Sequence, residues 1–319
     1  MKAFFIVLVA SLTSISSLSR TSGLSRTSSL SRTSRPPSVS SIIFTGDILL
    51  DRGVRRVIER KGADCLFTTQ VDSLFQSADI VVGNLECPAT HIKAPVQKRF
   101  IFRAEPEWLQ VLKKHGITHL NLANNHAIDQ GRRGLMDTKE RIRQTGMTPV
   151  GAGRTMSEAA QPILLTQQPR KVWLVSSLRL ALENYAYLTD KPCVSQEPMD
   201  SLLSRIRTLR RQDAKAVIIV SLHWGGENTA TPVPHQRLEA HRLINAGADM
   251  LICHHTHTLQ TIERYRGRDI YYSIGNFIFD QQKPINSKAC LVKVNVTKDK
   301  VSTTAIPIHI KHCIPHLKQ

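Results

Sequence analysis

Short apolar runs that each end in a polar residue recur along this chain, and stretches with helical periodicity separate them. Runs of this kind are typical of buried β-strands. They lie at residues 41–45, 79–83, 118–123, 171–176, 216–222, 249–253 and 269–274. Because strands alternate with helices in this order, the sequence predicts a layered α/β fold.

The segments between these runs have amphipathic patterns that predict helices. The patterns cover residues 107–115, 133–144, 199–212 and 235–246, and Gly116, Gly146 and Gly247 stand where helices commonly end. Period-two alternation at residues 289–297 and 301–310 predicts a β-hairpin near the end of the chain. We therefore expect a single folded domain over residues 41–319.

Residues 1–40 are not expected to join that domain. Lys2 precedes an apolar stretch, residues 3–10, which is too short to cross a bilayer and is typical of a secretory signal. A six-residue unit then repeats from Leu18, Leu24 and Leu30, and its Ser, Thr and Arg content favours a disordered spacer. We predict export to the cell envelope (periplasm or cell surface), with cleavage and retention as a membrane tether both open. A mis-assigned start and a repeat expansion without function are the alternatives.

The charge balance is strongly basic. The chain has 43 Lys and Arg against 25 Asp and Glu, a net charge of +18. Such an excess favours an anionic partner, although a merely basic soluble protein would share it. Nucleic acid is not expected as that partner, because aromatic residues make up only 5% and do not interleave with basic runs. The six cysteines contain no C-x-x-C pair, which argues against a zinc knuckle or a redox pair.

Side chains that bind metals follow five of the apolar runs. In open α/β sheets, ligands bind beyond the carboxyl ends of the strands, so we expect these side chains to meet. Oxygen donors mixed with imidazoles suit divalent ions such as Mn, Fe or Zn, and the set is large enough for two ions about 3.5–4 Å apart. Ordinary surface polarity is the alternative for the histidines. The residues are Asp47, Glu86, Asn125, His126, His223, His254, His255 and His257.

These segments, in this order, resemble the CapA family of capsule and poly-γ-glutamate synthesis proteins, within the calcineurin-like metallophosphatase superfamily. The matching stretches are residues 46–52, 83–88, 121–131, 223–227, 255–260 and 272–280. The resemblance spans most of the chain. It implies a metallophosphatase-like four-layer α-β-β-α sandwich with mixed sheets and a site at one edge.

The resemblance also implies roles for individual residues. His126 would be the acid or anion-binding group, and Asp129 would orient it. Glu227, Asn276 and Asp280 would contact substrate or shape its pocket. The implied ligands of the divalent ions (Mn, Fe, Zn or Mg) are Asp47, Glu86, Asn125, His223, His255 and His257.

One departure from the superfamily bears on the number of ions. Ile48 and Leu49 follow Asp47, where the superfamily has the pattern Asp-x-His, so one imidazole ligand is missing. Glu86 also stands where an aspartate is usual. A site with one ion is therefore open beside a site with two.

Two functions fit this resemblance. The first is a metal-dependent hydrolase acting on a phosphoester or amide in an anionic polymer. The alternative is a non-catalytic factor that binds, anchors or helps export a growing capsule polymer. Poly-γ-glutamate has a carboxylate on each unit, so it or a phosphorylated substrate is the expected partner of a basic protein, and a membrane-bound capsule synthesis complex is a further candidate. A binding module with a disused site is the third reading.

Overall fold

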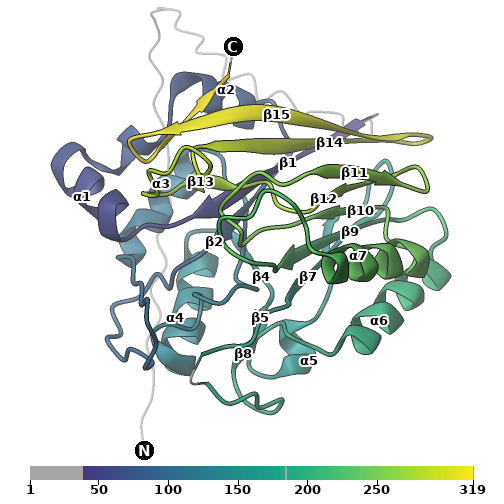
Figure 1. The fold of residues 1–319 in the computed structure, drawn as a ribbon, viewed down its shortest axis with the longest axis horizontal. Coiled ribbons are helices and arrows are strands. Elements are labelled where there is room, and N and C mark those ends of the chain that lie inside the picture. Colours follow the sequence, from purple (N-terminus) through teal and green to yellow (C-terminus); the bar gives the residue numbers. More distant parts are fainter. Residues whose placement is uncertain (1–38, 184, 319) are drawn as a thin grey trace, which may run out of the picture. The chain divides into compact units, whose positions relative to one another are not determined.

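The expected alternation of strands and helices builds two mixed β-sheets in the computed structural model, which describes residues 39–183 and 185–318 (Figure 1). Within these residues the larger sheet has the order β16-β15-β14-β1-β2-β3-β4, and β13 pairs with β1. Strands β1 to β4 run parallel, and β14 to β16 run antiparallel to their neighbours. The strands are β1 (Val39–Ile48), β2 (Ile80–Leu85), β3 (His119–Asn121), β4 (Thr148–Val150), β13 (Asn276–Ile278), β14 (Lys288–Thr297), β15 (Val301–Lys311) and β16 (Ile314–Leu317).

The second sheet has the order β11-β12-β10-β9-β7-β6 among the described residues. Its central strands are parallel, whereas β6 and β11 pair antiparallel at its edges. Its strands are β6 (Ile163–Thr166), β7 (Val172–Leu178), β9 (Val217–His223), β10 (Met250–Ile252), β11 (Ile262–Tyr265) and β12 (Arg268–Tyr271). A separate short ladder joins β5 (Ala152–Gly153) to β8 (Cys193–Val194).

Helices cover the outer faces of the two sheets. The first core cluster joins the larger sheet to α1–α4, and the second joins the other sheet to α6 and α7. Figure 1 shows α6 and α7 (green) beside β9, with α1 and α3 beside β1 and β13. The helices are α1 (Arg52–Lys61), α2 (Thr69–Gln76), α3 (Leu109–Lys114), α4 (Gly131–Gln144), α5 (Met156–Ala159), α6 (Met199–Gln212) and α7 (Pro234–Ala246), with short 3-10 turns η1 (Ala63–Leu66) and η2 (Pro106–Trp108).

The burial of adjacent strand residues shows that the two sheets pack face to face. Phe44 of β1 belongs to the cluster between the sheets, whereas its neighbour Ile43 packs toward the helices. In β9, Ile219 faces the other sheet and Val220 faces α6 and α7. Successive strand residues point to opposite faces, so a strand covered on both sides is apolar at every position. The four-layer α-β-β-α sandwich with mixed sheets is therefore confirmed.

Strand β1 extends further toward the C-terminus than the sequence pattern predicted. We expected this strand to stop before Gly46, but it continues to Ile48 because Asp47 pairs with Asn276 of β13 on one side and Asn84 of β2 on the other. A Cβ at Gly46 would collide with the backbone of Gly275, so only glycine permits this approach. The longer strand carries Asp47 into the edge where the candidate site forms.

The start of the domain also differs from the expectation. Strand β1 begins at Val39, which pairs with Thr297 of β14, rather than at residue 41. The rest of the predicted signal and spacer lies outside the described residues. In the part of the chain that the structure describes, no helix is both long and apolar enough to cross a membrane.

Because α7 packs against the second sheet, a Leu→Ala substitution on its buried face should destabilise the protein more than the same substitution on its exposed face. Leu243 is 0% exposed and Leu238 is 60% exposed, both on α7. We expect Leu243→Ala to lower the free energy of unfolding by about 2–5 kcal/mol, because it leaves a cavity in the core. Leu238→Ala, the matched control, should change it by less than about 0.5 kcal/mol. Urea denaturation of both variants measures this, and similar losses would contradict the layer assignment.

Candidate metal centre

The candidate site lies where parallel strands of both sheets end. In the larger sheet, Asp47 of β1 stands beside Asn84 of β2. In the second sheet, β9 ends at His223, which bridges to His254 just after β10. The two edges meet, since His254 Nε2 lies 3.0 Å from the carbonyl oxygen of Thr45 in β1. Carboxyl ends of parallel strands gather at one edge, which is why these distant segments converge.

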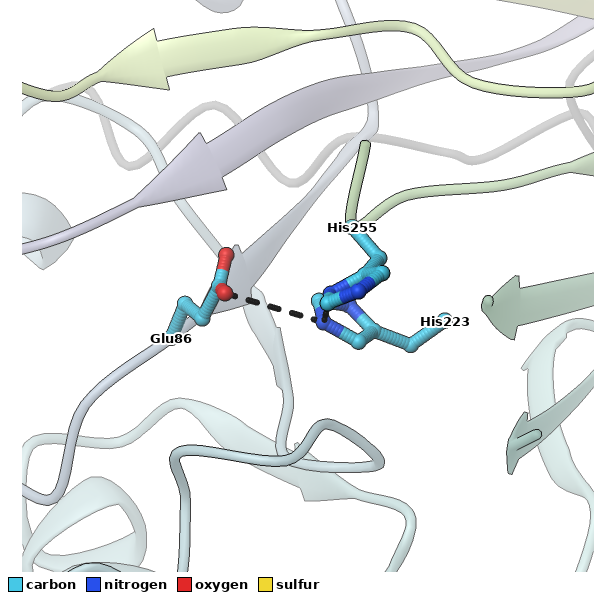
Figure 2. Close-up of side chains that lie close together, drawn as sticks. All are labelled: Glu86, His223 and His255. Atoms are coloured by element: carbon cyan, nitrogen blue, oxygen red, sulfur yellow. Dashed lines mark hydrogen bonds and ion pairs between the residues drawn. The ribbon is translucent and has the colours of Figure 1, made fainter. Parts of the chain in front are cut away.

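Five of the predicted ligands form two overlapping groups at this edge. Glu86, His223 and His255 make one group, and Asp47, Glu86 and His257 make the other, with ligand atoms of each group within 4.8 Å of one another. Glu86 Oε1 is 3.6 Å from His223 Nε2 and 3.7 Å from His257 Nε2. Figure 2 shows the carboxylate of Glu86 directed at the rings of His223 and His255. Glu86 is therefore common to both groups.

Glu86 is the buried group whose charge most needs compensation. Its side chain is fully buried, and neither carboxylate oxygen has a hydrogen-bond partner among the described residues. Burial raises the pKa of Glu86 well above its ordinary value, and the negative charge of Asp47 raises it further. A buried polar atom without a partner is uncommon and costly, so these two oxygens are suited to a cation. The carboxylate and imidazole donors fit a divalent transition metal.

Asp47 is held in its ionised form by its neighbours. Burial alone would raise the pKa of Asp47, but the hydrogen bond to His257 and the charges of His254 and His257 outweigh it, so this pKa is lowered. Asn84 Nδ2 donates to Asp47 Oδ1 at 2.7 Å, and His257 Nδ1 lies 3.2 Å from Asp47 Oδ2. Asp47 therefore presents a fixed carboxylate at the edge of the sheet.

Two histidines of the cluster, His223 and His255, are held in the neutral form, which is the form that binds metals. Burial lowers the pKa of His223 well below its ordinary value, with His255 adding to the effect. Burial, followed by the charge of His257, lowers the pKa of His255 to about 3. His255 and His257 also have left-handed backbones, with φ of 97° and 56°. Non-glycine residues in this region are strained, and such strain concentrates at functional sites.

Two asparagines, Asn125 and Asn84, contact the ring of His223 through its two nitrogens. Asn125 Oδ1 is 2.8 Å from His223 Nε2. Asn84 Nδ2 lies 3.3 Å from His223 Nδ1, and Asn84 Oδ1 accepts from Asn121 Nδ2 at 2.9 Å. Sequence reasoning did not single out Asn84 as a site residue, although it lies in the same Gly-Asn-Leu-Glu segment as Glu86.

His126 and Asp129 form a second polar group, in the loop after β3. His126 Nδ1 lies 2.8 Å from Asp129 Oδ2, which also accepts from the backbone N–H of Phe102 at 2.7 Å. The ring of Phe102 packs on His126 at 4.2 Å between centroids. Burial lowers the pKa of His126, although the hydrogen bond with Asp129 opposes this. The predicted orienting role of Asp129 therefore has a direct geometric basis.

Lys98 is a member of this group that sequence reasoning missed. Its side chain is only 4% exposed, and its Nζ lies 2.7 Å from Asp129 Oδ1. The same Nζ donates to the carbonyl oxygen of Asn125 at 3.0 Å and lies 3.3 Å from His126 Nδ1. Lys98 thus ties together the loop that carries Asn125, His126 and Asp129. It lies in a region with no strand or helix pattern, so no sequence pattern pointed to it.

Two of the three residues expected to contact substrate or shape its pocket make hydrogen bonds or ion pairs within the protein. Asn276 is fully buried and serves His257, whose Nδ1 lies 3.0 Å from Asn276 Oδ1. Asp280 pairs with Arg52 and accepts from the backbone N–H of Gly53, so it is engaged at the start of α1.

The printed contacts of Asn276 and Asp280 are with the protein itself, and their contact with substrate stays a prediction. Glu227, the third of the set, is exposed in the turn after β9, and its charge helps to raise the pKa of Glu86. The cysteines near the site take no part as ligands in the two groups: all six in the chain are free thiols, and Cys87 and Cys253 are buried.

The raised pKa of Glu86 predicts a pH dependence of stability in the metal-free protein. A carboxyl whose folded-state pKa lies above its ordinary value of 4.5 stabilises the fold below that value and loses this contribution as pH rises through the folded-state pKa. In a chelating buffer, Glu86→Gln should therefore gain stability relative to the unsubstituted protein as pH rises above about 5. Thermal unfolding of both proteins across this range measures the difference. Parallel pH profiles would show that Glu86 is not destabilised by burial.

Comparison with known proteins agrees with the geometry. The family model described as "Bacterial capsule synthesis protein PGA_cap" matches residues 41–281. The chain is 34% identical to the "PGA biosynthesis protein CapA" of Bacillus subtilis over 85% of this chain and 72% of that protein. It is 29% identical to the "Capsule biosynthesis protein CapA" of Bacillus anthracis, over 86% of this chain and 68% of that protein.

Solved structures are more distant. The Thermus thermophilus sulfate thiohydrolase SoxB aligns with a TM-score of 0.49 at 10% identity, over 86% of this chain and 57% of that chain. The Haemophilus influenzae NAD nucleotidase aligns with a TM-score of 0.48 at 10% identity, over 85% of this chain and 50% of that chain. The assignment does not depend on them, because the family match alone covers most of the chain. The chain therefore belongs to the bacterial capsule synthesis family PGA_cap, and it is similar to the CapA proteins of Bacillus.

Proposed function

We propose that this protein is a metal-dependent hydrolase that acts on a phosphoester or amide bond of an anionic polymer during capsule synthesis. The observation that carries the proposal is the fully buried Glu86, which has no hydrogen-bond partner among the described residues and is common to two groups of potential ligands. The relatives' names supply the capsule context, since they are proteins of PGA and capsule biosynthesis.

Each of the two ligand groups would bind one divalent ion. Glu86 with His223 and His255 would hold one divalent ion, and Glu86 with Asp47 and His257 would hold a second. Asn125 would add an amide oxygen near His223. When bound, such ions act as Lewis acids that polarise the oxygen of the scissile group. The donor set suits Mn, Fe or Zn better than Mg, because imidazole is a preferred ligand of the former.

His126 is the residue placed to move a proton. Its Nδ1 faces Asp129, which leaves Nε2 as the ring nitrogen open to a substrate. Asp129 orients the imidazole, and Lys98 fixes the second oxygen of Asp129. A neutral imidazole held in one orientation can accept a proton or donate Nε2–H to a leaving group, which is the role of a general acid or base. His126 is 6% exposed, so the ring is almost completely shielded from water.

A non-catalytic factor that binds, anchors or exports the polymer is the second candidate. The net charge of +18 favours it, because a basic surface attracts a polyanion whether or not a bond is cleaved. The pattern of residues 2–10 supports the cell envelope as the place of action for either function. The two candidates differ in whether Glu86 and His126 are needed.

Metal content and turnover of paired variants test the proposal. We expect Glu86→Gln to lose most bound metal, because it removes the donor common to both groups, and to lower turnover of a phosphodiester or polymer substrate by at least about a hundredfold. His126→Ala should keep the metal and lower turnover by about 10²–10⁴-fold. Elemental analysis and a steady-state assay with Mn, Fe or Zn measure both. Glu140→Gln, the same change at a surface position of α4, is the control.

Two results would contradict the hydrolase. One is an unsubstituted protein that binds none of these metals after reconstitution. The other is a metal-loaded protein whose turnover is the same in the His126→Ala variant, in which case the binding factor is the better account.

A further inference from the structure

A cleft lies between α2 and the strands β14, β15 and β16. Its volume is about 670 Å³, within the range of about 300–1,000 Å³ that is usual for ligand sites. Its lining contains no acidic residue. The basic side chains that line it are Lys288, His309, Lys311, His316 and Lys318.

These basic groups are not neutralised by the protein. Within residues 39–183 and 185–318, none of the five side chains lies in an ion pair with a carboxylate, whereas other basic residues such as Arg52 and Lys98 do. The charges are close enough to affect one another. Burial lowers the pKa of His316, and the charges of Lys311 and His309 lower it further. The cleft therefore has a positive potential that an anion would relieve.

Backbone hydrogen bonds link the strand that carries Asp47 to the strand that lines the cleft. The backbone N–H of Asp47 donates to the carbonyl oxygen of Gly275 at 3.1 Å, and the N–H of Cys290, next to the cleft residue Ala289, donates to Ile274. On the other side, Leu259 lines the cleft only two residues after His257. The cleft lining is therefore joined to the segments that carry Asp47 and His257 by short stretches of backbone.

The lining also alternates charge with apolar surface. Leu259, Pro307 and Leu317 lie among the lysines and histidines. A chain of methylene and amide units with a carboxylate on each unit matches such a surface, because its carboxylates pair with the cations and its methylenes cover the apolar patches. A single inorganic ion would fill little of this volume.

We propose that this cleft binds carboxylates of an anionic polymer of the poly-γ-glutamate type and holds the chain beside the metal-ligand groups. The inference rests on the proposed function for the identity of the polymer, and it adds the place at which this chain contacts it. The polymer is engaged through repeated carboxylate–lysine pairs, so its affinity depends on the lysines of this cleft and falls with added salt.

Charge reversal at the two ends of one hairpin tests the cleft. Lys288 and Lys311 lie at the cleft end of β14 and β15, and Lys298 and Lys300 lie at the turn at the opposite end. All four are exposed, and each double variant changes the net charge equally. We measure the binding of a fluorescent poly-γ-glutamate oligomer by anisotropy, in chelating buffer so that no metal contributes, and compare unfolding temperatures to verify folding.

We expect Lys288→Glu with Lys311→Glu to weaken binding about tenfold, since each exchange replaces an attraction by a repulsion. Lys298→Glu with Lys300→Glu should weaken it less than about twofold at the same ionic strength. If both double variants weaken oligomer binding equally, the effect comes from net charge alone, and the proposal that the oligomer binds in the cleft is wrong. Displacement of the oligomer by tripolyphosphate at a lower concentration than by a glutamate trimer would also overturn the carboxylate assignment.

The same assay separates this inference from the proposed function. Glu86→Gln should keep the affinity for the oligomer in chelator, because Glu86 is not part of the cleft. If the protein binds the oligomer at the cleft but takes up no metal, the hydrolase proposal is wrong and the proposal of polymer binding in the cleft is retained. Loss of oligomer binding in Glu86→Gln, with the fold intact, would instead place the polymer outside the cleft.

Discussion

The arrangement of the whole site depends on burying one carboxylate. Glu86 is fully buried, and its oxygens have no hydrogen-bond partner among the described residues. An isolated ion in the interior of a protein is destabilising by several kcal/mol, so a chain that keeps one must offset it. His223 and His255 are neutral and Asp47 is a second carboxylate, so none of these three neighbours of Glu86 supplies positive charge at neutral pH. Cations held between the two ligand groups would supply it.

The polar groups around Glu86 fall into three parts with separate tasks. Asp47, His223, His255 and His257 surround the buried carboxylate, and Asn84 and Asn276 fix their orientation. His126 stands beside them, held by Asp129 and in turn by Lys98. The basic cleft behind Gly275 is the third part, and its charges remain available to a ligand. The strand ends of the sandwich bring the first two parts together, and hydrogen bonds to Gly275 and Ile274 link β1 to β14, which lines the third.

Much of this could be predicted because it follows from strand ends. Buried strands are continuous apolar runs, and parallel strands put the next polar residue at a common edge, so Asp47, Glu86, His223 and His257 could be expected to meet. Helices α6 and α7 were also predictable, since their apolar positions repeat with helical period. Helices α1 and α2 were missed, because α1 buries only Val54, Val57 and Ile58 among charged residues.

Residues whose role depends on tertiary contacts could not be predicted. Lys98 lies in an irregular segment, and only the folded loop shows that its Nζ reaches Asp129 and Asn125. Asn276 and Asp280 were expected to contact substrate or shape its pocket, and only the fold shows their contacts with His257 and with the start of α1. The cleft required the pairing of β14, β15 and β16, which brings Lys288 and Lys311 to one end of the hairpin.

Anomalous diffraction from crystals soaked in a manganese or zinc salt tests the shared role of Glu86 most directly. The account predicts anomalous density next to the Glu86 carboxylate, within coordination distance of His223 and His255 on one side or of Asp47 and His257 on the other, and at both positions when two ions bind. Well-ordered crystals without anomalous density at either position, and with the Glu86 carboxyl hydrogen-bonded to protein or water instead, would contradict it.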